Sequence, residues 1–160
     1  MFTEIVRAPN QHLFRYKSLL INFHWHEFEL DHFRTIGRVC TQLVKEHRQM
    51  SSIIVMRGQF NFSLTPEARK AGASLTKEFA ATNTGQAILI EADGFRASLA
   101  RSLITGVNLL SGSRSKQRVF QEARETVPWL CGLENQPPEI RDQATPLWEA
   151  FQKLLASLPV

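Results

Sequence analysis

The sequence is poor in cysteine and has no long apolar run. Its 160 residues include two cysteines, Cys40 and Cys131, and a lone pair this far apart does not indicate a disulfide framework. No apolar stretch approaches the ~20 residues that a membrane-spanning helix needs. The first twelve residues carry polar or charged side chains every few positions, unlike a signal peptide. These absences predict a cytoplasmic protein with reduced thiols and no transmembrane segment.

Concentrated positive charge is also missing. No run of five basic residues occurs, and 19 Lys and Arg against 15 Asp and Glu give a formal net charge of only +4. A nucleic-acid partner is therefore not expected. With 43% hydrophobic and 21% charged residues, the composition is typical of a globular domain that forms a packed core without disulfides or metals.

Motifs of catalytic and metal-binding proteins are absent from the sequence. It has no Gly-x-Ser-x-Gly elbow, no glycine-rich phosphate loop and no CxxC pair. On a strand, His24 and His26 would lie on one face, and His32, Glu27 or Asp31 could supply a third metal ligand. No later cluster completes such a site. We therefore predict no metal, no cofactor and no enzymatic activity.

Hydrophobic periodicity in the first half predicts strands followed by a helix. The segments Thr3 to Val6 and Leu13 to Phe23 alternate or run apolar on either side of a Pro9-Asn10 turn, which predicts two strands in a hairpin-like start. Leu30 to His47 carries an apolar stripe at helical spacing, with Asp31 in its first turn. Ser52 to Met56 is a short β-branched run, typical of a buried strand.

The second half continues the alternation. Thr65 is a good N-cap and Pro66 suits the first helical position, so a helix is expected to start there. Ala87 to Ile90 predicts a buried strand, Phe95 to Leu110 a long amphipathic helix, and Arg118 to Phe120 a short edge strand before another helix. This order requires an α/β fold with a parallel sheet covered by helices.

The composition changes after Leu133. A break at Gln136-Pro137-Pro138 precedes a last amphipathic helix. We therefore expect a domain over residues 1–132 and an appended linker and helix over residues 133–160. The helix either packs on its own domain or docks a partner or a second copy of the chain, giving a homo-oligomer. Its apolar residues are Leu147, Trp148, Phe151, Leu154, Leu155 and Leu158.

The run EADGFR at residues 91–96, with RSLITGVNLL and RVFQEARETVPWL after it, resembles the SpoIIAA-like (STAS) fold family, and most of all the lone bacterial SpoIIAA-like proteins. The resemblance covers about residues 1–132. It implies a single-domain α/β protein with a mixed, mostly parallel sheet. It also implies a non-enzymatic regulatory or scaffold module that acts by contact with a protein partner, without a cofactor.

The resemblance also implies a partner surface. In phospho-switch members of the family, a serine where the third strand meets the second major helix is modified by a kinase partner. The matching junction here is residues 62–66, which lack the Asp and Gly of the family motif. Ser63 and Thr65 are the candidate phosphorylation sites, although Thr65 could simply cap the helix. The expected partner-binding residues are Phe60, Phe62, Ser63, Thr65 and Arg69.

Other sites and functions stay open. Arg114, Lys116 and Arg118 could hold an anion in the loop before the edge strand, and a solvated turn is the alternative. A small-ligand or lipid-binding protein is the second functional hypothesis, because the related CRAL-TRIO lipid-transfer fold shares this layering. An immunity-type protein that neutralises a toxin by docking is the third.

The stripe on the predicted helix Phe95 to Leu110 is testable by mutation. We expect Leu103→Ala to lower the free energy of unfolding by about 2 to 5 kcal/mol, because it leaves a cavity and loses transfer energy. Arg101→Ala, on the opposite face, should be near neutral. Urea midpoints measure both, and equal effects would show that the stripe is wrongly assigned.

Overall fold

The computed structural model describes residues 1–58, 64–91, 94, 98, 101–102, 104–105 and 116–159. Six strands form one mixed sheet: β1 Thr3–Ala8, β2 Gln11–Tyr16, β3 Leu19–Trp25, β4 Met50–Arg57, β5 Asn83–Glu91 and β6 Gln117–Phe120. The helices bounded within the described residues are α1 Leu30–His47, α2 Pro66–Glu78, α4 Ala123–Cys131, α5 Pro138–Arg141 and α6 Ala144–Ser157.

The strands lie side by side in the order in which they occur in the chain, from β1 to β6. β1, β2 and β3 pair antiparallel, and β3 to β6 pair parallel. Parallel neighbours need a crossover connection, which α1 supplies from β3 to β4 and α2 from β4 to β5. The predicted mixed, mostly parallel sheet is therefore confirmed, as is the position of β6 at the edge.

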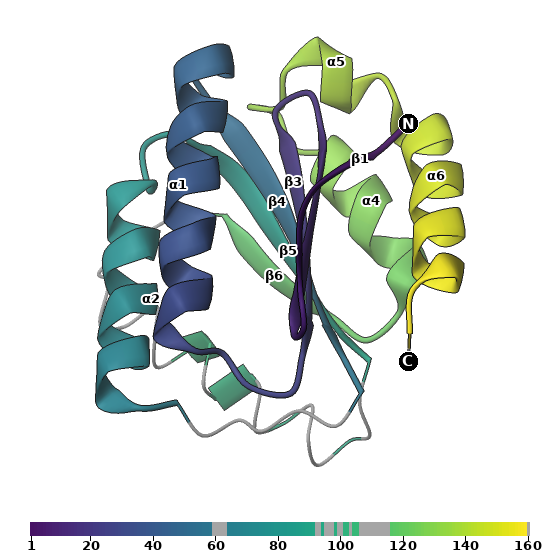
Figure 1. Ribbon diagram of the computed structural model, residues 1–160. Helices are drawn as coiled ribbons and strands as arrows, with labels where there is room; N and C mark the ends of the chain where they lie inside the picture. The colour runs from purple at the N-terminus through teal and green to yellow at the C-terminus, as the bar shows by residue number, and fades with distance from the viewer. Residues whose placement is uncertain are drawn as a thin grey trace.

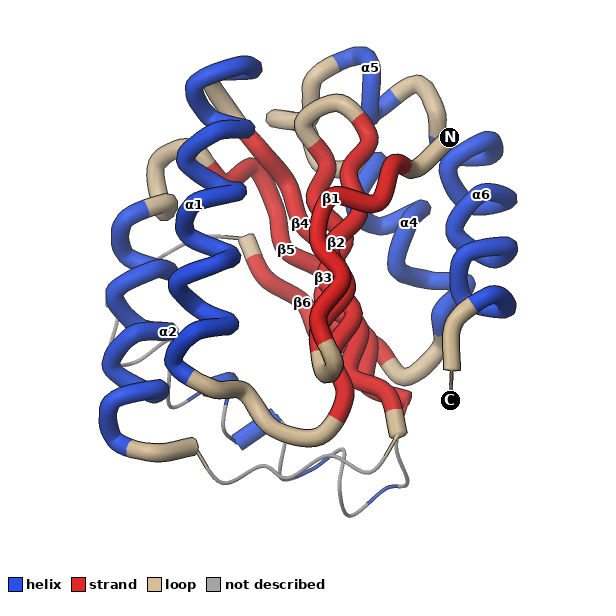
Figure 2. The backbone as a smooth tube through the Cα atoms, in the orientation of Figure 1, coloured by secondary structure: helices blue, strands red, loops and turns tan. Residues whose placement is uncertain are grey.

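Helices cover both faces of the sheet. α1 and α2 lie on one face, and α4, α5 and α6 lie on the other (Figure 1). The tube drawing shows the strands as a twisted layer between these two groups (Figure 2). Among the described residues, no helix is both long and apolar enough to cross a bilayer.

Local sequence signals place α1 and α2 as predicted. The stripe on α1 buries Ile36, Cys40 and Leu43, with Asp31 in the first turn of the helix. The Thr65 hydroxyl accepts a hydrogen bond from the Ala68 amide at 3.1 Å, which caps α2. α2 thus begins where its capping chemistry indicates.

The segment predicted as one strand from Leu13 to Phe23 is two strands. β2 ends at Tyr16 and β3 begins at Leu19, and Lys17 has a φ of 52° in the turn between them. Tight hairpin turns need this left-handed backbone and usually place Asn or Gly there. Lys17 gives no such signal, so the turn was missed.

The predicted helix from Phe95 to Leu110 lies mostly outside the described residues. Residues 98, 101–102 and 104–105 are helical. Arg101 is exposed and Ile104 is half-buried, as the predicted stripe requires.

The C-terminal helix is part of the core. Leu147 and Phe151 on α6 are fully buried, in one cluster with Phe23, Val55 and Leu130. α6 therefore packs on its own domain, which is one of the two arrangements expected for the segment 133–160. An amphipathic stripe indicates that one side of a helix is buried, but it does not indicate which surface buries it.

We expect Phe151→Ala to lower the free energy of unfolding by about 3 to 5 kcal/mol, because the ring is fully buried between α6 and the sheet. The neighbouring Gln152→Ala is the control, since Gln152 is exposed on the same helix. Urea denaturation of both variants measures the difference. If the two midpoints shift equally, α6 does not contribute to the core.

Candidate functional site

A cavity of about 130 Å³ lies between the sheet and the helix pair α1 and α2. Its walls are mostly apolar and include Phe33 and Ile36 from α1, Leu75 from α2, and Ile54 and Met56 from β4. The described part of its lining contains no charged residue. The arrangement can hold a small uncharged molecule against apolar side chains.

A row of polar side chains crosses the sheet on the cavity side. Ser52, Gln86 and Gln117 stand opposite one another in register on β4, β5 and β6, and all three line the cavity. Gln117 Nε2 donates to Gln86 Oε1, and Gln86 Nε2 donates to Ser52 Oγ at 3.2 Å. The strand register thus places polar groups along one side of an otherwise apolar space.

Asn22 on β3 adds an amide to the same wall. It is 2% exposed, and its Oδ1 accepts from Gln11 Nε2 at 3.4 Å. Its Nδ2 is buried and has no hydrogen-bond partner. A buried donor without an acceptor is costly, and this one belongs to a residue that lines the cavity.

Cys40 also lines the cavity. Burial is the main cause that raises the pKa of its thiol to about 12, with a smaller contribution from Glu78. The thiol therefore stays protonated at neutral pH, and only a thiolate is a strong nucleophile. Cys40 contributes apolar surface to the cavity.

The predicted partner surface is only partly described. Phe60, Phe62 and Ser63 lie outside the described residues. Thr65 and Arg69 are both exposed at the start of α2, and Thr65 caps the helix. The expected phosphorylation of Ser63 or Thr65 stays a prediction.

The predicted anion-binding loop is also partly described. Arg114 lies outside the described residues, whereas Lys116 and Arg118 are exposed. The Arg118 guanidinium carbon lies 5.1 Å from the centroid of the Phe120 ring. An anion site in this loop stays a prediction.

The histidines considered for a metal do not share a strand face. β3 ends at Trp25, and His26 is exposed with a φ of 63°. His24 is fully buried instead, with its ring centroid 4.6 Å from that of His32. No group of three His, Cys, Asp or Glu side chains suited to a metal occurs in the described part of the chain.

His24 is held as a neutral ring. Its Nδ1 lies 2.5 Å from the Asn10 carbonyl oxygen, so Nδ1 carries the proton. Burial, assisted by the nearby His32, lowers the pKa of His24 to about 3. The His32 Nδ1 in turn accepts a hydrogen bond from the Glu29 amide at 3.0 Å. These contacts give His24 a structural role at the entry to α1.

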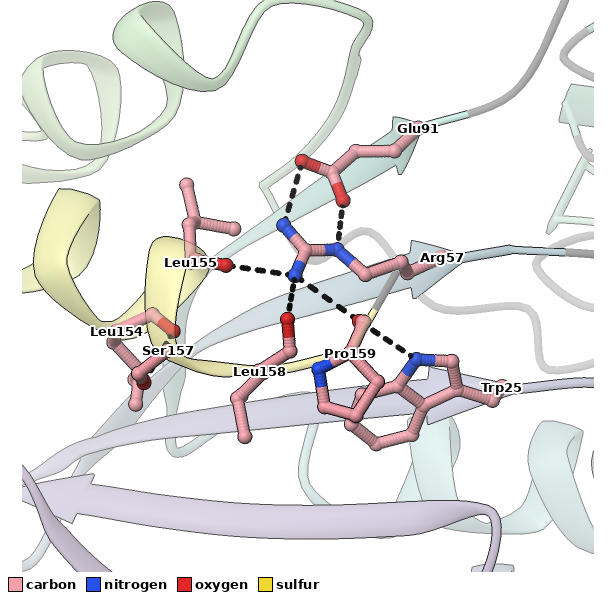
Figure 3. A network of polar contacts seen from close by, with 8 residues as sticks. All are labelled: Trp25, Arg57, Glu91, Leu154, Leu155, Ser157, Leu158 and Pro159. Carbon is pink, nitrogen blue, oxygen red and sulfur yellow. Dashed lines mark hydrogen bonds and ion pairs between the residues drawn. The ribbon is translucent and has the colours of Figure 1, made fainter.

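A second polar cluster lies at the carboxyl ends of β4 and β5. Arg57 on β4 donates to both carboxylate oxygens of Glu91 on β5. It also donates to the carbonyls of Leu155, Leu158 and Pro159, at 2.7, 3.0 and 3.2 Å (Figure 3).

This end of a parallel sheet is where α/β proteins usually bind ligands. The C-terminal chain occupies it here, because its carbonyls take up the Arg57 donors. Trp25 Nε1 adds a further hydrogen bond to Pro159. The cavity beside α1 and α2 is therefore the better candidate site.

Sequence reasoning missed the cavity and its amides. Asn22 lies within the apolar strand LLINFHW, and a polar residue inside a buried strand is the signal that could have drawn attention to it. Gln86 and Gln117 gave no signal, because their meeting depends on strand register.

Comparison of the chain with protein-family models, curated proteins and solved structures finds no match.

The lowered pKa of His24 predicts acid sensitivity. The unfolded chain takes up the proton near the ordinary pKa of 6.5 and the folded chain only near 3. The contribution of His24 to the free energy of unfolding is therefore complete above pH 6.5. It falls by up to about 1.4 kcal/mol per pH unit as the pH decreases towards 3.

We expect His24→Gln to flatten this dependence of the free energy of unfolding, measured by urea denaturation between pH 4 and 7. The control is His26→Gln, which removes an exposed imidazole. If the free energy of unfolding of His24→Gln changes with pH as steeply as that of the wild type, His24 is not the cause of the acid sensitivity.

Proposed function

We propose that this protein is a non-enzymatic binding module that holds a small, mostly apolar ligand in the cavity between the sheet and the helices α1 and α2. The cavity of about 130 Å³ is the observation that carries the proposal. Protein interiors are close-packed and have few voids larger than a water molecule.

The size of the cavity favours a small molecule over a lipid. An engineered apolar cavity of about 150 Å³ binds benzene, which is close to the volume here. The acyl chains of a membrane lipid need several times that space. Of the two ligand classes that the sequence leaves open, the small ligand is therefore proposed.

The chemistry of the lining supports binding rather than catalysis. The described lining offers amides, hydroxyls and one thiol. The thiol is Cys40, whose raised pKa keeps it protonated. General acid-base catalysis near neutral pH needs a group that titrates there.

The SpoIIAA-like (STAS) assignment is part of the proposal. It is supported by the sequential strand order, with parallel pairing from β3 to β6 and helices on both faces. A cytoplasmic location is proposed as well. Cys40 and Cys131 are free, buried thiols in core clusters on opposite faces of the sheet.

A regulatory or scaffold role through a protein partner is the second candidate. The observation that favours it is the exposure of Thr65 and Arg69 together at the start of α2. A phosphate at this end of a helix would meet the positive end of the helix dipole. A homo-oligomer through α6 would use only its outer face, because Leu147 and Phe151 are buried in the protein's own core.

The proposed function is tested with toluene as a probe of the cavity. In a titration followed by ¹H–¹⁵N correlation spectra, we expect saturable shifts at amides around the cavity, with a dissociation constant of roughly 1 mM. Ile54→Phe should abolish the shifts by filling the space that Ile54 lines. Thr76→Leu, from the helix side of the cavity, should weaken them.

The matched control is Ile5→Phe, the same change at an exposed position on β1. It should bind toluene as the wild type does. Absence of saturable shifts in the wild type, or equal binding in Ile54→Phe with the fold verified by circular dichroism, would show that the cavity is not a binding site.

A further inference from the structure

Two hydrogen-bond donors on residues that line the cavity, Asn22 and Ser52, indicate the chemistry of the ligand. The amide of Asn22 lies with its Oδ1 accepting from the buried Gln11 Nε2 at 3.4 Å. This contact leaves Nδ2 as the group without a partner. Asn22 is 2% exposed and lines the cavity, and its Nδ2 has almost no exposed surface.

Ser52 supplies a second donor on the neighbouring strand. Its Oγ accepts from Gln86 Nε2, and its own hydroxyl hydrogen has no acceptor among the described residues. Ser52 pairs with Leu20 on β3, two residues before Asn22. The two donors therefore stand one register step apart on the same face of the sheet.

We infer, on the basis of the proposed binding function, that the ligand is a small neutral carbonyl compound whose oxygen accepts hydrogen bonds from Asn22 Nδ2 and Ser52 Oγ. A carbonyl oxygen has two lone pairs and can accept from both donors at once. The rest of the molecule lies against the apolar side chains from α1, α2 and β4.

The charge and size of the cavity restrict the class further. Its described lining has no cationic side chain, which favours a neutral ligand, because a buried carboxylate or phosphate needs a counter-charge. The volume of about 130 Å³ suits a body the size of a single aromatic ring. A small ketone, aldehyde or amide fits both limits.

The test compares three probes of similar shape. Acetophenone carries the carbonyl, α-methylstyrene replaces its oxygen by a methylene group, and benzoate adds a negative charge. By titration calorimetry we expect acetophenone to bind about tenfold more tightly than α-methylstyrene, the gain from one or two satisfied buried donors. Benzoate should not bind measurably.

In Asn22→Leu, the ratio of the two affinities should fall to about one, with α-methylstyrene binding retained. Asn135→Leu is the matched control, because it makes the same change at an exposed turn position, and the tenfold ratio should persist there. If Asn22→Leu does not fold, Gln11→Leu combined with Asn22→Leu removes both partners of the hydrogen bond, which proteins tolerate better.

The side-chain amide signal of Asn22 gives a direct reading in the wild type. Its Nδ2 proton resonances should shift downfield with acetophenone and not with α-methylstyrene. Equal affinity for these two probes, tighter binding of benzoate, or an unchanged ratio in the variants overturns the carbonyl assignment. In that event the proposed function still stands if the wild type binds toluene and Ile54→Phe does not. If none of the probes binds, both the carbonyl assignment and the proposed function are wrong.

Discussion

The buried guanidinium of Arg57 is the interaction on which the arrangement of this domain depends. The residue is 5% exposed, and a buried charge must be paired and hydrogen-bonded to be tolerated. Glu91 on the next strand supplies the countercharge, and the carbonyls of three C-terminal residues take the remaining contacts. The end of α6 must therefore dock at the carboxyl ends of β4 and β5, which holds that helix over one face of the sheet (Figure 3).

The two faces of the sheet then differ in kind. Under α4 and α6, aromatic rings fill the core, with Phe23 between Phe14 and Trp25. Under α1 and α2, polar side chains interrupt the apolar face and a cavity remains. Buried polar atoms without a partner occur on both faces, among them Ser51 Oγ on the aromatic face and Asn22 Nδ2 on the other. Only Asn22 lies in the described lining of the cavity.

Signals confined to a few neighbouring residues were enough to predict much of the fold. The stripe on α1, the Thr65 cap and the edge strand before α4 follow from periodicity and capping. The docking of α6 could not be predicted, because it depends on contacts between Arg57 and carbonyls about a hundred positions later. The candidate site could not be predicted from the sequence for the same reason. Only the pairing of the strands brings together Asn22, Ser52 and Gln86.

The sequential strand order has a consequence for synthesis on the ribosome. Each strand pairs with the one made just before it, so the sheet can extend as the chain emerges, without waiting for distant segments. The aromatic face is completed only when α6 arrives. Until then Arg57 lacks its carbonyl partners, and the rings around Phe23 are open to water and to other nascent chains. During synthesis, this domain is therefore most prone to aggregation in the interval before α6 packs on the sheet.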